Sequence, residues 1–241
     1  MQTTSSPTSI RRSHRRKTWP TAVWLAVSAA LVALAFLGTS SGSGGTDNDD
    51  EILYDPNLAI GGAVFYGLLI AVSVVIARGY ARPFDALGFR RFRMRWVWIS
   101  LAVVVATTIV AIATEPFLHG GEEQGLGADR WEPEHSGAFA ANVVILVLVG
   151  PFAEELFFRG IGVRALMVFG GLTAILATGV IFGLVHGILG ALPPLVLFGI
   201  GLSWVRLRSA SVWPSFIGHA TYNGLGILLL VLAWATDTPV R

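Results

Sequence analysis

The stretch 150-GPFAEELFFRG-160 lies in one of the most apolar parts of the chain, between 139-FAANVVILVLV-149 and 161-IGVRALMVFGGL-172. Three ionisable side chains, Glu154, Glu155 and Arg159, interrupt an otherwise hydrophobic segment. Each such group costs about 2.5–3.5 kcal/mol at the centre of a membrane helix, whereas an apolar residue returns only about 0.3–0.6 kcal/mol. A helix that carries all three is therefore expected to bury them against other helices or in a wet cavity.

The composition predicts a membrane protein. Of the 241 residues, 54% are hydrophobic and 13% are charged, and the mean hydropathy is +0.66. Soluble domains have about 25% charged residues. We therefore expect an all-α fold, a polytopic transmembrane bundle of about seven helices in the cell membrane. The chain has no cysteine, which excludes disulfides, iron–sulfur clusters and thiol nucleophiles.

The apolar segments divide the chain into regions. A basic cytoplasmic tail (1–19) precedes transmembrane helices and loops (20–137), a transmembrane core (138–235) and a short tail (236–241). The expected spans are 20–38, 58–77, 96–114, 138–158, 171–190, 191–207 and 213–235.

Charge sets the expected orientation. Basic segments (11–17, 78–95, 159–164, 206–208) alternate with neutral or acidic ones (47–51, 115–137, 187–193). The positive-inside rule then places the N-terminus in the cytoplasm and the C-terminus outside. Because the first basic run lies next to a span, it is expected to fix topology, and no nucleic-acid partner is predicted. His14, His119 and His135 are expected to be exposed.

Helical spacing gives the two adjacent acids different surroundings. Glu155 and Arg159 are four residues apart and share a helix face, so they can pair and offset part of their burial cost. Glu154 is rotated by about 100° and lacks that partner. A carboxylate without a counter-charge is suited to accept or donate a proton.

Two later segments carry further polar groups. Phe182 and His186 are four residues apart in 182-FGLVH-186, and Ser215, His219 and Asn223 form one helix stripe in 215-SFIGHATYN-223. A neutral imidazole can act as a base, a hydrogen-bond donor or a metal ligand. An Asn one turn from a His supplies an uncharged donor for a developing oxyanion.

Together these segments resemble the CPBP family of intramembrane proteases, which comprises CAAX proteases and bacteriocin-processing enzymes and is also called Abi. EELFFRG (154–160), FGLVH (182–186) and HATYN (219–223) match the motifs EExxxR, FxxxH and HxxxN in order. The resemblance covers about residues 138–235.

The resemblance implies an endopeptidase that hydrolyses peptide bonds of membrane-associated proteins or peptides. Glu154 matches the acid that activates water, and His186 matches the residue that helps to hold it. His219 and Asn223 match the oxyanion-stabilising positions. Glu155 and Arg159 match the supporting pair, with Phe182 and Ser215 beside the histidines.

Metal dependence and substrate are open at this point. Glu154, His186 and His219 could bind Zn²⁺ with water in an open position, but the chain lacks the helical zinc signature HExxH. A metal-free glutamate mechanism is the alternative. The substrate could be a prenylated CAAX protein, a peptide leader or a membrane-protein partner, and the oligomeric state is open.

Two other functions compete with the peptidase. One is a non-catalytic immunity or scaffold protein of the same fold, and the other is a proton-coupled carrier, for which buried Glu and His are also expected. A peptidase needs its polar groups to converge in depth. His186 would lie roughly 22 Å along a span that begins at residue 171. Glu154 would lie near the cytoplasmic end of a span that ends at 158, unless the boundaries around 159–170 differ.

Overall fold

The computed structural model describes residues 18–40, 49–120 and 131–235, and every regular element in these ranges is helical. The predicted all-α class is therefore confirmed. Residues 1–17 of the expected N-terminal tail (1–19), the expected C-terminal tail (236–241) and His14 lie outside the described residues. Apart from one continuous helix in the middle of the chain, the described residues form seven helices and a short 3-10 helix. They are α1 (Trp19–Ser40), η1 (Asp49–Tyr54), α2 (Pro56–Ala77), α3 (Pro83–Leu87), α4 (Arg95–Leu118), α8 (Gly171–Leu184), α9 (Leu192–Ser209) and α10 (Trp213–Ala235).

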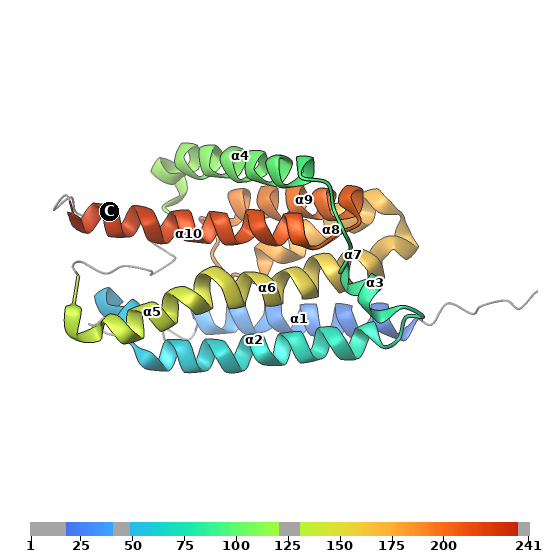
Figure 1. Ribbon diagram of the computed structural model, residues 1–241, viewed down its shortest axis with the longest axis horizontal. Helices are drawn as coiled ribbons and strands as arrows, with labels where there is room; N and C mark the ends of the chain where they lie inside the picture. Colours follow the sequence, from blue (N-terminus) through green and yellow to red (C-terminus); the bar gives the residue numbers. More distant parts are fainter. Residues whose placement is uncertain (1–17, 41–48, 121–130, 236–241) are drawn as a thin grey trace, which may run out of the picture.

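One long helix, Pro133–Phe169, makes up the middle of the chain. Its successive segments are η3 (Pro133–His135), α5 (Ser136–Val144), η4 (Ile145–Val149), α6 (Gly150–Glu154), η5 (Glu155–Gly162), α7 (Val163–Leu166) and η6 (Met167–Phe169). This helix lies between α1 and α2 on one side and α10 and α4 on the other (Figure 1). The elements η4 and η5 are π-helical.

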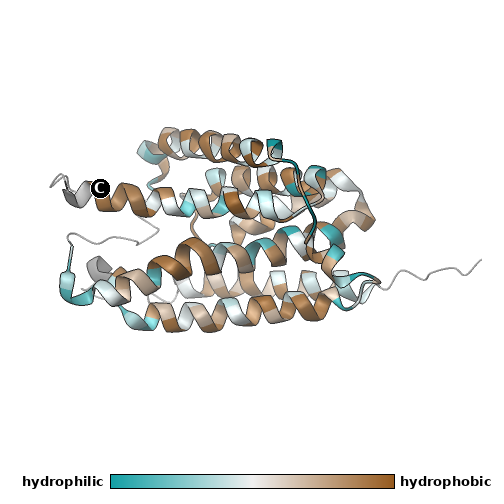
Figure 2. Ribbon diagram, in the orientation of Figure 1, coloured by the Kyte–Doolittle hydropathy of each residue, from teal (hydrophilic) through white to brown (hydrophobic). Residues whose placement is uncertain are grey.

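Within the described part of the chain, five helices are long and apolar enough to cross a membrane: Trp19–Gly38, Pro56–Ala77, Arg95–Leu118, Pro133–Phe169 and Trp213–Leu232. The chain is thus a multi-pass membrane protein. Hydrophobic residues colour the middle of the bundle and hydrophilic residues gather at its two ends (Figure 2). The end that carries Tyr80, Arg90, Arg164 and Arg206 is called the basic end below.

Two predicted boundaries are wrong. The span expected at 138–158 continues to Phe169, because neighbouring helices bury Arg159 and residues 160–163, which stay helical. The span expected at 171–190 ends at Leu184, since Gly187 takes a left-handed φ of 70° that a helix cannot continue through. With only 14 residues, α8 extends about 21 Å, less than the roughly 30 Å of a bilayer core.

The helices α8 and α9 form a tightly packed hairpin in which two glycines permit close approach. A Cβ on Gly179 would lie 2.5 Å from the backbone nitrogen of Ile200, and a Cβ on Gly199 would lie 2.6 Å from the Gly179 carbonyl oxygen. Small residues at such contacts let membrane helices pack backbone against backbone. This hairpin brings the residues after Leu184 beside the long helix.

At the basic end, the short helix α3 is held by an ion pair. Arg90 donates from Nε to Asp85 Oδ1 at 3.1 Å and contacts Oδ2 at 2.9 Å, and Arg82 lies 3.8 Å from the same carboxylate. The hydrogen bond from Arg90 is the main cause that lowers the pKa of Asp85 below its ordinary value.

We expect the Asp85 ion pair to persist into mildly acidic solution. Because the pKa is lower in the folded state, the pair stabilises α3 at neutral pH, and this contribution is lost as the pH falls through the folded-state pKa. A ¹³C NMR titration of the Asp85 carboxylate in micelles should give a midpoint below about 3.9. Arg90→Gln should raise that midpoint, whereas the exposed Arg91→Gln should not. An unchanged midpoint in Arg90→Gln would contradict this assignment.

Candidate active site

The first π-helical segment is explained by Pro151. Proline has no N–H to donate and its ring crowds the carbonyl four residues earlier, so a regular helix cannot pass through it. The chain widens its turn just before this residue, and the Gly150 N–H bonds to the Ile145 carbonyl instead of that of Leu146. The Leu146 carbonyl oxygen is thereby left without its helical donor.

Asn223 satisfies this carbonyl. Its Nδ2 donates to the Leu146 oxygen at 2.8 Å and so ties α10 to the π-helical turn. The amide keeps a second N–H. The predicted oxyanion residue is thus placed one turn along α10 from His219, with one of its two donors already bound to the backbone.

Removing the Asn223 amide should destabilise the fold. Asn223→Leu would leave the Leu146 carbonyl unpaired inside the membrane, which costs about 1–3 kcal/mol in the free energy of unfolding. Thermal unfolding in detergent measures this loss. The matched control is Thr221→Val, because the Thr221 hydroxyl is exposed and bonds only to the Ile217 carbonyl of its own helix. Equal stability of the two variants would count against the proposed tie.

The second π-helical segment carries the predicted ion pair. Arg159 Nη1 lies 2.9 Å from Glu155 Oε1, and both side chains have no exposed area. The contact is an ion pair by distance, although its angle is not that of a hydrogen bond. The guanidinium also lies 4.1 Å from the ring centre of Phe182, a cation–π contact. The pairing expected from the i,i+4 spacing is therefore present in the structure.

His219 connects the two acids. Its Nδ1 lies 3.1 Å from Glu155 Oε1, and because a carboxylate can only accept, this nitrogen donates. Its Nε2 then faces Glu154 Oε2 at 3.8 Å. Ser215, one turn earlier on α10, is buried near Glu155 and donates its hydroxyl to the Val212 carbonyl at 2.9 Å. The sequence spacing did not predict this bridging position of His219.

Glu154 differs from its neighbour in its surroundings. Its side chain is 15% exposed, and Oε2 is buried without a hydrogen-bond partner. The Tyr66 hydroxyl on α2 lies near the same carboxylate. An unsatisfied carboxylate oxygen opposite an imidazole nitrogen is a site where a water molecule can be held by both groups.

His186 joins this group from the turn after α8. Its Nδ1 donates to the Phe182 carbonyl at 2.7 Å, which leaves Nε2 as its remaining polar atom. The Phe182 ring packs against His186 at 4.8 Å and His219 at 5.6 Å between ring centres, and His186 lies within electrostatic range of Glu154.

The depth of the site follows from the corrected helix ends. Glu154 precedes the turn at Gly170 by as many residues as His186 follows it, so at 1.5 Å per residue both lie roughly 24 Å from that turn. The two groups converge because the long helix continues to Phe169. The expected obstacle to convergence is therefore absent.

Two side chains near the site were missed by sequence reasoning. Tyr66 approaches Glu154, and Trp24 on α1 donates from Nε1 to the Phe157 carbonyl at 2.9 Å within the second π-helical segment. Single aromatic residues are common in membrane helices, so neither position carried a distinguishing signal. Both show that helices before the predicted catalytic core support the site.

A three-ligand zinc site is not formed by the residues as they lie. Across 18–40, 49–120 and 131–235, no three His, Asp or Glu side chains are grouped as ligands of one ion would be. The Nδ1 atoms of His186 and His219 are engaged, by a carbonyl and by Glu155, so Nε2 is the atom of each ring that could bind a metal. No step of the proposed reaction passes through a metal, and metal dependence stays open, as it was from the sequence.

The remaining predicted histidines lie at the opposite end of the bundle. His119 is exposed at the end of α4, as expected. His135 has a side chain that is 54% exposed, and its Nδ1 lies 2.8 Å from Glu132 Oε2. Neither belongs to the buried cluster.

The fold and the cluster define a class: a multi-pass helical membrane protein with a largely buried cluster of Glu and His side chains between its helices. Residues 136–225, which contain all three motifs, match the family model described as Type II CAAX prenyl endopeptidase Rce1-like. This segment of the chain is similar to that family, which is one of membrane endopeptidases. Searches of curated proteins and of solved structures gave no significant match.

Proposed function

We propose that the chain hydrolyses peptide bonds inside the membrane with a water activated by Glu154. The observation that carries this proposal is the 3.8 Å separation of Glu154 Oε2 and His219 Nε2, with Oε2 buried and unpartnered. Two groups at this separation can each hydrogen-bond one water at about 2.8 Å. The water would lie between Glu154 Oε2 and His219 Nε2.

The proposed steps balance as a hydrolysis. Glu154 takes a proton from the water while its oxygen attacks the carbonyl carbon of the scissile bond, and His186 assists in holding the acid and water. The developing oxyanion accepts hydrogen bonds from the free N–H of Asn223 and from Nε2–H of His219, which in this proposal keeps a proton on each ring nitrogen before and after the step. Glu154 then gives its proton to the leaving amine as the C–N bond breaks.

Supporting residues keep these groups in position. Glu155 accepts from His219 Nδ1 and so orients Nε2 towards Glu154. Arg159 balances the charge of Glu155. The Phe182 ring contacts both the Arg159 guanidinium and the His219 imidazole. Each supporting group acts through another side chain rather than on the substrate.

The substrate is proposed to be a membrane-associated protein or peptide, reached at the cell membrane with the N-terminus of the enzyme in the cytoplasm. Mass spectrometry of protein ends should test this in cells that express either the wild type or Glu154→Gln. We expect new C-termini of membrane proteins or peptides only with the wild type. Identical ends in both strains, with any biological function kept, would instead support the non-catalytic scaffold.

A further inference from the structure

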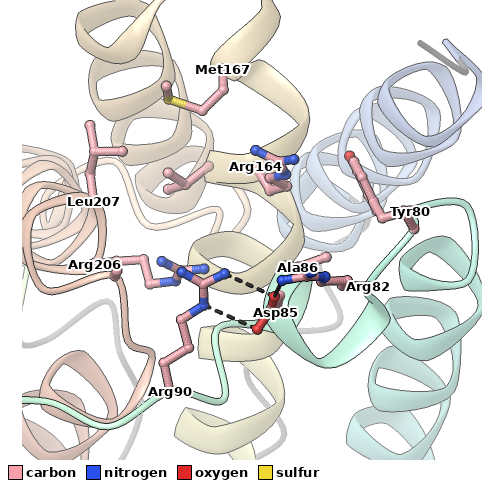
Figure 3. A pocket seen from close by; sticks show the side chains of 12 residues that line it. Tyr80, Arg82, Asp85, Ala86, Arg90, Arg164, Met167, Arg206 and Leu207 are labelled. Carbon is pink, nitrogen blue, oxygen red and sulfur yellow. Dashed lines mark hydrogen bonds and ion pairs between the residues drawn. The ribbon is translucent and has the colours of Figure 1, made fainter. Parts of the chain in front are cut away.

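A separate cavity of about 420 Å³ lies at the basic end of the bundle (Figure 3). It is partly open, and its walls come from residues 80–90, from the end of the long helix and from the end of α9. None of the candidate catalytic residues lines it. Its volume is in the range of sites that hold small molecules, about 300–1,000 Å³.

Positive charge predominates in this cavity. Four arginines, Arg82, Arg90, Arg164 and Arg206, line it against a single acid, Asp85, which gives a surplus of three positive charges. Asp85 is already engaged by two of them, Arg90 and Arg82, and the dashed lines in Figure 3 mark these contacts. The acid therefore does not balance the other two guanidinium groups.

Arg206 is the most informative of the four. Its residue is only 8% exposed, yet its Nε has no hydrogen-bond partner. The other acid within electrostatic range, Glu155, is already held by Arg159 and His219. Because a guanidinium stays charged and an unpaired buried charge is costly, this arrangement calls for an anion.

The chain makes room for Arg206 with a glycine. Gly88 ends α3 with a left-handed φ of 87°, and a Cβ at this position would lie 2.6 Å from Arg206 Nε. A side chain on residue 88 would thus be strained and would displace the guanidinium. The position of Arg206 beside the cavity depends on this backbone.

The other walls indicate what kind of anion fits. Arg164 is exposed and stacks over the Tyr80 ring at 5.5 Å, whereas Val163, Met167 and Leu207 form an apolar side. Figure 3 shows Met167 and Leu207 on the far side of the arginines from Asp85. A free phosphate would match only the charged part of this lining. A ligand with an anionic head and an apolar body would match both.

We propose that this cavity binds the phosphate head group of an anionic membrane lipid. Guanidinium groups bind phosphate through paired N–H donors, and basic pockets between membrane helices suit lipid head groups. The proposal rests on the cavity and its arginines alone and holds whether or not the peptidase mechanism is correct.

The test is lipid binding by the purified full chain in detergent, followed by native mass spectrometry and thermal unfolding. Dioleoyl-phosphatidylglycerol should stay bound and raise the unfolding temperature, and dioleoyl-phosphatidylcholine should bind at least tenfold more weakly. Arg164→Gln combined with Arg206→Gln should weaken phosphatidylglycerol binding at least tenfold. Arg91→Gln combined with Arg93→Gln is the matched control, because both residues are exposed and lie outside the cavity.

Single variants keep the test decisive if the double variant fails to fold. Arg164→Gln changes an exposed side chain and should by itself reduce binding at least threefold, while Arg206→Lys keeps the charge but loses the paired donors. Equal binding of the two lipids, or unchanged binding in Arg164→Gln, would overturn the proposal. Equal stabilisation by millimolar inorganic phosphate would also overturn it, in favour of a free-phosphate site.

Discussion

Glu154→Gln should lower the rate of peptide cleavage by about 10²–10⁴-fold, the usual contribution of a general base. The amide has nearly the same shape as the carboxylate but cannot accept a proton from water. Arg159 pairs with Glu155 and not with Glu154, whose Oε2 has no hydrogen-bond partner. The substitution therefore leaves the buried Glu155–Arg159 pair in place. Cleavage of a membrane-embedded peptide by purified protein in proteoliposomes measures the loss, which should fall on kcat rather than KM.

The matched control is Glu134→Gln, which changes an exposed acid at the start of the long helix. It should cleave at the wild-type rate. Both variants should unfold at the same temperature as the wild type. Wild-type activity in folded Glu154→Gln would remove this residue from the mechanism.

Arg159→Met should cause the largest loss of stability, about 3–5 kcal/mol in the free energy of unfolding. The substitution leaves Glu155 buried and charged, with His219 as its remaining partner from the cluster. It also removes the cation–π contact with Phe182. Thermal unfolding in detergent measures the effect, and the yield of folded protein should fall with it.

A second substitution separates charge from packing. Adding Glu155→Gln to Arg159→Met removes the uncompensated charge while an amide oxygen can still accept from His219, so much of the lost stability should return. Arg91→Met, at an exposed position, should change stability little. If the double variant is as unstable as Arg159→Met alone, the buried ion pair is not the source of the loss.

The sequence predicted the parts of the site that depend on local helix geometry. The i,i+4 spacing placed Glu155 against Arg159 and set Glu154 apart, and the structure has both features. The spacing put Ser215, His219 and Asn223 on one stripe of the last helix, and in the structure Ser215 and His219 lie beside the acids. These relations follow from the period of a helix and need no knowledge of the fold.

Other features could not be predicted because they depend on tertiary packing. The way α10 crosses the long helix decides which of the two acids accepts the hydrogen bond from His219. Tyr66 and Trp24 reach the site from helices that are distant in sequence. The helix through 159–169 looked like a boundary because Arg159 and Arg164 interrupt its hydrophobicity. Burial of Arg159 and the stacking of Arg164 on Tyr80 allow it to continue.

The central claim is that Glu154 activates water for peptide hydrolysis, and cleavage in H₂¹⁸O tests it most directly. Purified wild-type protein and Glu154→Gln would each be given a membrane-embedded peptide, and the fragments would be weighed by mass spectrometry. We predict one ¹⁸O atom in the new C-terminal carboxylate with the wild type, and labelled fragment from Glu154→Gln at least about 10²-fold slower. Labelled fragment formed at equal rates by the two proteins would contradict this claim. So would a wild-type protein that cleaves none of the peptides whose ends differ between cells expressing the wild type and cells expressing Glu154→Gln.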